Sequence, residues 1–129
     1  MTATPPDWLI RSALFVPGDD ERKLARATTA GADALIYDLE DAVAAKRKAD
    51  ARQRVCAALS GPGPALRLVR VNALDTPWGA QDIRAVGAAG AHGVLIPKCD
   101  SAATLAQADA LLAGTQTRLV ALTETPAGV

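Results

Sequence analysis

The stretch ADALIYDLED, residues 32–41, is an apolar run that ends in three carboxylates. Its aliphatic and aromatic residues are typical of a buried strand. Acidic residues are poor strand formers and costly to bury, so Asp38, Glu40 and Asp41 need a reason to stand at the end of such a run. Because neighbouring runs also end in polar residues, this stretch indicates which kind of sheet the chain forms.

The same alternation of an apolar run and a helical stretch recurs along the chain. The apolar runs cover residues 12–18, 32–41, 66–72, 93–99 and 118–124. Helices are expected over about 20–30, 44–59, 78–89 and 101–113, with Ser101 as the N-cap of the last one. Five strands separated by four helices predict βαβ units around a parallel sheet.

Two architectures accommodate this order of elements, an open doubly wound sheet and a (β/α)8 barrel. A doubly wound sheet fits the 129 residues, but no GxGxxG motif or P-loop follows the first run, where such folds usually hold phosphate. Polar residues end nearly every run, and barrel active sites are assembled at that end of the strands. The expected fold class is therefore α/β, a TIM (β/α)8 barrel of which this chain carries only about the first five strands and four helices.

A complete barrel has eight strands in roughly 250 residues, so the chain is expected to be a fragment of a longer protein. Residues 1–10, with Pro5 and Pro6, are expected to form a flexible N-terminal lead-in. Residues 11–129 are expected to form the N-terminal part of the barrel, an incomplete single domain.

Composition and charge exclude several classes of function. Equal numbers of basic and acidic residues, 14 of each, argue against nucleic acid or an anionic membrane as the main partner. No apolar stretch approaches the ~18 residues of a membrane span, and no signal peptide is recognisable. Cys56 and Cys99 lie far apart and outside any metal-binding motif, as expected for thiols in a reducing compartment. A soluble cytoplasmic protein is expected.

Alternation along the strands sorts the side chains between the two faces of the sheet. Four sets each begin apolar and end polar: Ile36, Asp38 and Glu40; Leu68, Arg70 and Asn72; Val94, Ile96 and Lys98; Val120, Leu122 and Glu124. If these are the inward faces, the apolar residues form one layer and the polar residues form a second layer above it. The pattern predicts a compact site of mixed charge at the mouth of the barrel.

Most of these side chains also have a simpler interpretation. Asp41 is expected to cap the following helix rather than take part in chemistry. Asp38 and Glu40 on their own could be solvated loop carboxylates, and Lys98 could lie along the surface. Arg70 inside a strand requires a carboxylate partner from the protein or from a ligand, because an unpaired buried charge costs several kcal/mol.

Five motifs in order resemble one known family, the citrate lyase β-subunit-like branch of the HpcH/HpaI aldolase superfamily. They are RSALFVPGDDERKLARA, ADALIYDLEDAV, VRVN, GVLIPKCDS and TETPAGV, between Arg11 and Val129. The resemblance implies a TIM barrel, a magnesium ion, an acyl-CoA thioester substrate and a homo-oligomer, a trimer or hexamer. Related aldolases usually place a histidine after the acidic pair of the second strand, where this chain has Asp41, and this favours the lyase branch.

The resemblance also implies roles for single residues. Arg70 is expected to hold the substrate carboxylate or its developing oxyanion, with Asp38 and Glu40 as the acidic pair that positions it and a bound water. Glu124 is expected to be a magnesium ligand. The substrate-binding group is expected to comprise Arg70, Asn72, Lys98, Pro17 and Gly18.

The implied function is a Mg2+-dependent carbon–carbon lyase of the citryl-CoA lyase type. It would cleave a 3-hydroxyacyl-CoA, such as citryl-, malyl- or citramalyl-CoA, to acetyl-CoA or a related acyl-CoA and an oxo acid. The full-length protein is expected to be the enzyme, and the 129-residue chain alone is expected to be inactive. The alternatives are a class II aldolase of 2-oxo acids such as pyruvate, and a non-catalytic half-barrel that pairs with another chain.

Overall fold

The computed structural model describes residues 11–61, 66–97 and 101–121. The elements are β1 (Ala13–Pro17), α1 (Glu21–Ala27), β2 (Ala34–Asp38), the short 3-10 helix η1 (Ala45–Arg47), α2 (Lys48–Leu59), β3 (Leu66–Arg70), α3 (Gly79–Ala88), β4 (Gly93–Ile96), α4 (Ala102–Leu111) and β5 (Arg118–Ala121). The predicted order of five strands and four longer helices is confirmed. The expected lead-in, residues 1–10, lies outside the described ranges.

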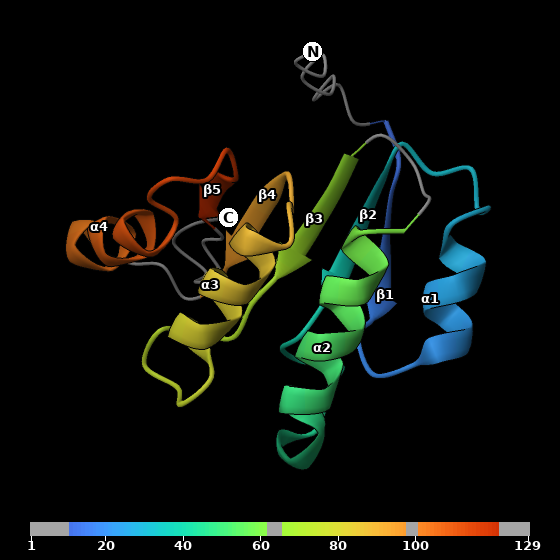
Figure 1. Cartoon of the computed structure of the whole chain (residues 1–129), viewed down its shortest axis with the longest axis horizontal. Coiled ribbons are helices and arrows are strands. Elements are labelled where there is room, and N and C mark those ends of the chain that lie inside the picture. Colours follow the sequence, from blue (N-terminus) through green and yellow to red (C-terminus); the bar gives the residue numbers. More distant parts are fainter. Residues whose placement is uncertain (1–10, 62–65, 98–100, 122–129) are drawn as a thin grey trace.

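The five strands form one parallel sheet whose spatial order equals their order in the chain, β1-β2-β3-β4-β5. A doubly wound sheet reverses its strand order at a switch point, so this alternative is wrong. Figure 1 shows the strands following one another across the sheet, with the helices beside them. Sequential parallel strands joined through helices are the arrangement of a (β/α)8 barrel wall, and the chain supplies five of its strands.

The two faces of the sheet carry two separate apolar clusters. The first cluster joins the strands to all four α-helices through Val16, Leu24, Ala27, Leu35, Tyr37, Leu39, Val43, Ala51, Val55, Leu59, Val69, Val71, Ile83, Val86, Ala91, Val94, Ile96, Ala108 and Leu112. The second cluster contains strand residues only: Ala34, Ile36, Leu66, Leu68, Leu95 and, partly buried, Val120. Helices cover one face and strand side chains line the other, as in the outside and the inside of a barrel wall.

The expected inward faces are confirmed for Ile36 and Asp38 of β2 and for Leu68 and Arg70 of β3. The expectation is wrong for Asn72, which follows β3 and forms hydrogen bonds with α2 and α3, and for β4. Leu95 packs in the strand-only cluster, whereas Val94 and Ile96 pack in the cluster with the helices. All four residues of β4 are apolar or glycine and all are buried, so the alternation offered no contrast between the two faces. The inward alternation therefore runs through Gly93 and Leu95.

The strand register sets a row of residues across the inner face. Pro17 pairs with Asp38, Asp38 with Arg70, Arg70 with Leu95, and Leu95 with Val120. In parallel strands, paired residues point to the same face of the sheet. Asp38 and Arg70 thus stand side by side at the carboxyl ends of β2 and β3, where a barrel builds its active site.

The helix starts follow ordinary capping chemistry at two places and depart from it at a third. The side chain of Ser101 accepts a hydrogen bond from the backbone N–H of Thr104 (3.2 Å), which confirms it as the N-cap of α4. Asp20 caps α1 in the same way. The expectation that Asp41 caps the next helix is wrong, because η1 intervenes with Ala44 at its N-cap and no side-chain cap.

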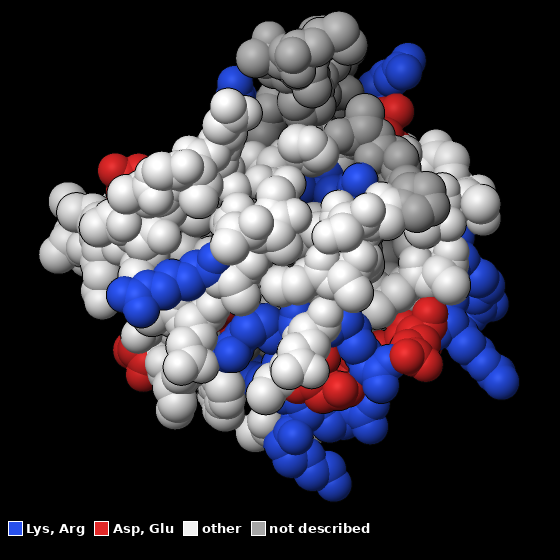
Figure 2. All heavy atoms as spheres, viewed as in Figure 1, with Lys and Arg blue, Asp and Glu red and all other residues white. Residues whose placement is uncertain are grey.

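Charged side chains on the helix-covered face gather around α2. Figure 2, in the same view as Figure 1, shows basic and acidic side chains crowded together in the lower part of the molecule. Arg54 of α2 pairs there with Asp50 (2.7 Å) and with Glu21 of α1. Such exposed pairs stabilise a fold only slightly. Over the described ranges, no helix has the length and apolar character needed to cross a membrane.

Candidate active site

Asp38 and Arg70 form a two-pronged ion pair at the ends of β2 and β3. Arg70 donates from Nε to Oδ1 of Asp38 (2.9 Å) and from Nη2 to Oδ2 (2.8 Å). Asp38 is almost completely buried, and the Arg70 side chain is 17% exposed. The planar guanidinium matches the carboxylate geometry, and a paired arrangement of this kind fixes orientation as well as charge. The pair thus provides a rigid, oriented cation at the rim of the sheet.

The backbone that follows β2 wraps around the same carboxylate. Asp38 accepts hydrogen bonds from the backbone N–H groups of Glu40 (2.9 Å) and Ala42 (3.0 Å). Burial alone would raise the pKa of Asp38, but the hydrogen bonds from Arg70 and from these two backbone groups more than offset it, so the pKa lies below its usual value. Asp38 is therefore held ionised, with both oxygens engaged within the protein.

Two further carboxylates and one aromatic ring surround the Arg70 guanidinium. Glu40 lies 3.6 Å from Nε, and the exposed Asp41 lies 4.0 Å from Nη2. The Phe15 ring, from β1, lies 5.1 Å from the guanidinium carbon, within the range of a cation–π contact. The hydrogen bonds from Arg70 to Asp38 are the main cause that raises the pKa of Arg70. Arg70 is thus permanently charged, and no described residue engages its Nη1.

The Asp38–Arg70 pair borders an open hollow in the surface. The hollow has a volume of about 280 Å³ and is lined by Phe15, Pro17, Asp38, Ala42 and Arg70. Its wall combines the Asp38–Arg70 ion pair with apolar side chains, and a few polar groups in an apolar lining are the usual mixture of a small-molecule site. A small anionic group placed in this hollow would meet the guanidinium.

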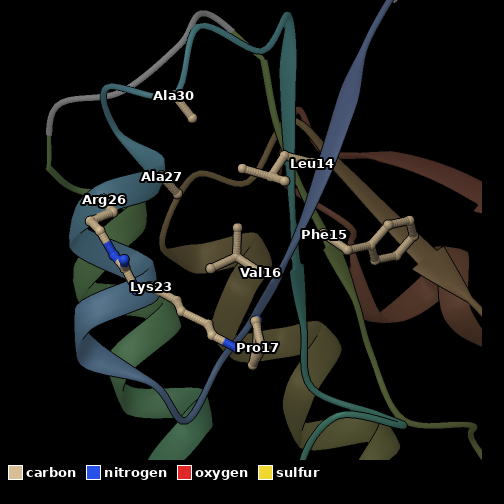
Figure 3. Close-up of a pocket in the computed structure, with 8 residues that line it drawn as sticks. All are labelled: Leu14, Phe15, Val16, Pro17, Lys23, Arg26, Ala27 and Ala30. Atoms are coloured by element: carbon tan, nitrogen blue, oxygen red, sulfur yellow. The ribbon is translucent and has the colours of Figure 1, made fainter.

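A second hollow, of about 280 Å³, lies between β1 and α1. Figure 3 shows Leu14 and Val16 pointing towards α1, whereas Phe15 points to the opposite side of the strand. Two of its lining residues, Lys23 and Arg26, are charged. The others are Leu14, Phe15, Val16, Pro17, Ala27 and Ala30. The Asp38–Arg70 pair does not line this hollow, although Phe15 and Pro17 line both hollows.

The structure brings most of the predicted residues of β1, β2 and β3 together at one rim. Asp38, Glu40 and Arg70 contact one another, as expected, and Pro17 lines the hollow beside them. Gly18 has a packing role there: a Cβ atom on it would lie 2.9 Å from the carbonyl oxygen of Asp38. Glycine lets the turn after β1 approach the end of β2 closely. The functional roles predicted for these residues stay predictions.

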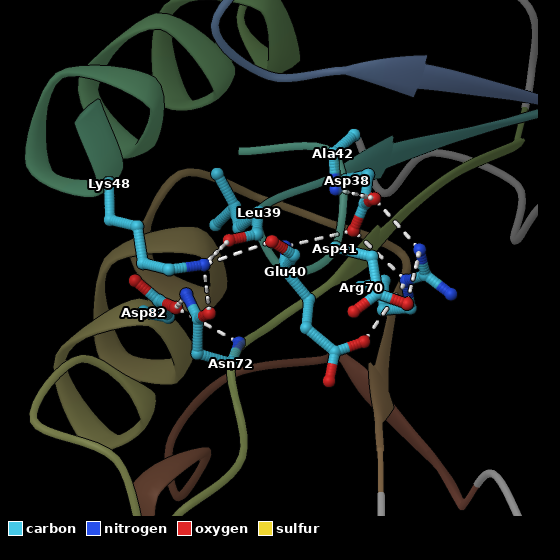
Figure 4. A network of polar contacts seen from close by, with 9 residues as sticks. All are labelled: Asp38, Leu39, Glu40, Asp41, Ala42, Lys48, Arg70, Asn72 and Asp82. Atoms are coloured by element: carbon cyan, nitrogen blue, oxygen red, sulfur yellow. Dashed lines mark hydrogen bonds and ion pairs between the residues drawn. The ribbon is translucent and has the colours of Figure 1, made fainter. Parts of the chain in front are cut away.

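Asn72 takes part in a second polar network beside the first, as Figure 4 shows. It accepts a hydrogen bond from Nζ of Lys48 (2.6 Å) and donates from its Nδ2 to Asp82 (2.7 Å). Its side chain is buried between α2 and α3 and does not line the hollow of Arg70. Sequence reasoning missed Lys48 and Asp82, since nothing in their spacing marks them as partners of Asn72.

The predicted metal site falls beyond the part of the chain that the structure describes. Lys98 and the expected ligand Glu124 are both outside the described ranges. Among the described residues, no three side chains of His, Cys, Asp or Glu come together in a group that could hold a metal ion. The oxygens of Asp38 are already taken by Arg70 and the backbone. The described residues do not by themselves fit a magnesium site.

His92 lies at the opposite end of the sheet from the Asp38–Arg70 pair. It precedes β4, and its Nδ1 accepts a hydrogen bond from the backbone N–H of Arg67 (3.0 Å). Burial, together with the nearby charge of Arg67, lowers the pKa of His92. The histidine thus joins the starts of β3 and β4 in its neutral form and is remote from the carboxyl-end site.

Curated proteins similar to this chain include two kinds of enzyme that differ in their named activities. A (3S)-malyl-CoA thioesterase of Cereibacter sphaeroides is 45% identical over 104 residues, which cover 79% of this chain and 36% of the relative. The citrate lyase subunit beta of Escherichia coli is 46% identical over 94 residues, covering 71% of this chain and 31% of the relative. The chain thus spans about a third of the length of these curated relatives.

Solved structures with the same fold include the protein CitE from Mycobacterium tuberculosis in complex with magnesium and pyruvate. It is 34% identical, with a TM-score of 0.74, over 93% of this chain and 47% of that protein. The same protein with magnesium, acetoacetate and coenzyme A matches with a TM-score of 0.67 at 34% identity, over 87% of this chain and 40% of that one. The sequence profile of the HpcH/HpaI aldolase/citrate lyase family matches residues 11–129. With this match over the five-stranded wall and its Asp38–Arg70 site, the chain belongs to the HpcH/HpaI aldolase/citrate lyase family.

Proposed function

We propose that the protein containing this chain is a Mg2+-dependent lyase that cleaves the carbon–carbon bond of a 3-hydroxyacyl-CoA. The observation that carries the proposal is the orientation of Arg70, fixed by Asp38 at the rim of a hollow at the carboxyl ends of the strands. The similarity to citrate lyase subunit beta and to a structure with coenzyme A supports the substrate class. Citryl-, malyl- and citramalyl-CoA are the substrates proposed.

Arg70 binds the acidic end of the substrate in this proposal. Asp38 occupies Nε and one side of Nη2, so the guanidinium presents Nη1 and the other side of Nη2 to a ligand. These N–H groups suit a carboxylate, or an oxygen on which negative charge develops as the carbon–carbon bond breaks. Because Asp38 fixes the guanidinium beforehand, little reorganisation is required when the charge develops.

Asp38 and Glu40 have different parts in this proposal. Asp38 makes all of its contacts within the protein and is a positioning residue for Arg70. Glu40 lies close to Nε of Arg70 without the paired geometry of Asp38. We propose Glu40 as the carboxylate that orients a bound water or the hydroxyl group of the substrate beside Arg70.

Magnesium is proposed as the cofactor because relatives of known structure are complexes with this ion. When bound, it would act as a Lewis acid on oxygen atoms of the substrate. Glu124 is the ligand that we propose from the sequence motif TETPAGV.

Thioester hydrolysis is the second candidate function. The similarity to (3S)-malyl-CoA thioesterase favours it, because that relative matches this chain at 45% identity. Both candidate reactions use an acyl-CoA with a carboxylate at its far end, so both agree with the same role for Arg70. They differ in the bond that breaks, which is the bond between the hydroxyl-bearing carbon and the α-carbon in the lyase and the thioester C–S bond in the hydrolase.

Product analysis with (3S)-malyl-CoA and citryl-CoA tests the proposal. The purified protein with its complete chain is incubated with each thioester and Mg2+, and the products are separated by chromatography. A lyase yields acetyl-CoA and a 2-oxo acid without a free thiol, whereas a thioesterase yields free CoA and the hydroxy acid. Cleavage of free hydroxy-oxo acids as fast as thioesters would support the aldolase alternative and contradict the proposal.

A further inference from the structure

Lys48 is a buried cation whose hydrogen-bonding capacity is fully used. It is 8% exposed, and its Nζ donates to the carbonyl oxygens of Leu39 (3.0 Å) and Glu40 (2.9 Å) and to Oδ1 of Asn72 (2.6 Å). An ammonium group has three donors, so all of them are engaged. The Trp78 ring lies 5.2 Å from the same nitrogen. The side chain therefore has no donor left for a substrate.

The position of Lys48 in its helix is unfavourable for a cation. Lys48 is the first residue of α2, where the helix dipole disfavours positive charge. Lysine is also almost never fully buried unless it is paired. A residue that departs from the usual preferences for its position in this way usually belongs to a functional or strained site. The contacts of the ammonium group are therefore what holds Lys48 in this place.

These contacts connect the chain segments that leave the two halves of the Asp38–Arg70 pair. Leu39 and Glu40 directly follow Asp38, and Asn72 is two residues beyond Arg70. Figure 4 shows the ammonium group on one side of the segment 39–42 and the ion pair on the other. Lys48 thus binds β2 to β3 just beyond the point where the strand ladder ends.

A buried carboxylate anchors the far side of this connection. Asp82 of α3 has no exposed surface. It accepts from the backbone N–H of Asn72 (3.1 Å) and from its Nδ2 (2.7 Å), and Arg52 of α2 donates to it from Nε (2.8 Å). The hydrogen bond from Nδ2 of Asn72 to Asp82 orients the Asn72 amide so that its Oδ1 faces Lys48. The network therefore attaches the end of β3 to two helices.

We propose that Lys48 is a positioning residue, which holds Asp38, Glu40 and Arg70 in their mutual arrangement by joining the ends of β2 and β3 through Asn72. The part that this arrangement has in catalysis rests on the proposed function; the coupling between Lys48 and the ion pair does not. Loss of the ammonium group frees the carbonyls of Leu39 and Glu40. The Leu39 carbonyl shares a peptide unit with the N–H of Glu40, which binds Asp38. The ion pair then loosens although none of its own atoms has changed.

The test compares Lys48→Met with Lys46→Met, a matched loss of charge at an exposed position two residues earlier. Selective 15N-arginine and 13C-aspartate labelling of the complete chain reports the solvent exchange of the Arg70 Nε–H and the titration of Asp38 by NMR. We expect exchange about tenfold faster in Lys48→Met, and an Asp38 pKa closer to its usual value. The Lys46→Met variant should match the wild type. Unchanged exchange and titration in Lys48→Met, with Arg70 and Asp38 as in the wild type, would overturn the proposal.

Two further measurements decide the case in which Lys48→Met fails to fold. In the wild type, 15N-lysine labelling should show a slowly exchanging ammonium group with a nuclear Overhauser effect to the Asn72 amide. Lys48→Arg should restore part of the protection of Arg70 Nε–H, since a guanidinium can still donate to the two carbonyls. Absence of the slow ammonium signal would contradict the proposal. None of these readouts requires enzymatic turnover, so a failure of the proposed function would not be confused with a failure of this coupling.

Discussion

Asp38 and Arg70 are direct neighbours across two parallel strands, and the guanidinium donates to both oxygens of the carboxylate at 2.9 and 2.8 Å. Removing one partner of such a buried pair is strongly destabilising, because the other charge is left without compensation. The strands, rather than flexible loops, carry both partners, and this gives the site its rigidity.

Asp38→Asn should lower the free energy of unfolding by about 3 kcal/mol, since Arg70 loses its ionised partner. Urea denaturation followed by circular dichroism measures the change. Asp41→Asn is the matched control, because Asp41 lies 4.0 Å from the same guanidinium with its side chain 80% exposed, and a change within about 0.5 kcal/mol is expected. If the two substitutions lowered the free energy of unfolding equally, the burial of Asp38 would not be what makes its pairing with Arg70 strong.

Arg70→Lys should reduce kcat/KM for the cleavage of malyl- or citryl-CoA by about 100-fold, if the protein acts as proposed. Lysine keeps the charge but cannot bind Asp38 with two parallel hydrogen bonds and still present donors to a substrate. Steady-state kinetics measures the effect, and the exposed Arg84→Lys serves as the control. Full activity of Arg70→Lys would show that charge alone suffices and that orientation is irrelevant.

The free energy of unfolding should fall as the pH drops below 6.5, in part because of His92. Its pKa in the folded protein is lowered from the ordinary 6.5, so the unfolded state binds the proton more readily. The stabilisation is fully present above pH 6.5 and is lost as the pH falls through the folded pKa. Urea denaturation at several pH values should show a smaller pH dependence in His92→Gln. An identical pH dependence would refute the assignment to His92.

Gly18→Ala should lower the free energy of unfolding by about 1–3 kcal/mol through overpacking. The added methyl group would lie 2.9 Å from the backbone oxygen of Asp38 and from Val55 Cγ2, and backbone cannot easily yield. Gly61→Ala is the control, because its nearest neighbour would be at 3.5 Å. Thermal unfolding compares the two variants, and a Gly18→Ala variant as stable as Gly61→Ala would be evidence against the close approach.

The sequence was sufficient for those parts of the fold in which polar and apolar residues contrast. The apolar run before Asp38, and Arg70 within its own run, identified the strand ends and the face that they share. Over Gly93–Ile96 the same reasoning failed, since a strand buried on both sides reads as a continuous apolar run. Contrast between the faces, rather than hydrophobicity itself, made the alternation informative.

Long-range polar contacts were beyond what the sequence could indicate. Lys48 and Asn72 are 24 residues apart, and Asn72 and Asp82 are 10 apart, with no periodicity that relates them. The one local signal was a lysine close to an expected helix start, where acidic residues are preferred. The capping role expected of Asp41 was wrong because the 3-10 helix Ala45–Arg47, which the sequence did not indicate, precedes the α-helix.

The cross-strand pairing of Asp38 with Arg70 also has a consequence for the folding of the chain. If β3 slipped by one residue against β2, Asp38 would stand opposite Val69 or Val71, both of which belong to the helix-side core. The guanidinium of Arg70 would then enter an apolar layer without its carboxylate, at a cost of several kcal/mol. The same two charges that build the candidate site therefore discriminate against misaligned sheets, and they help to select the correct alignment of the barrel wall.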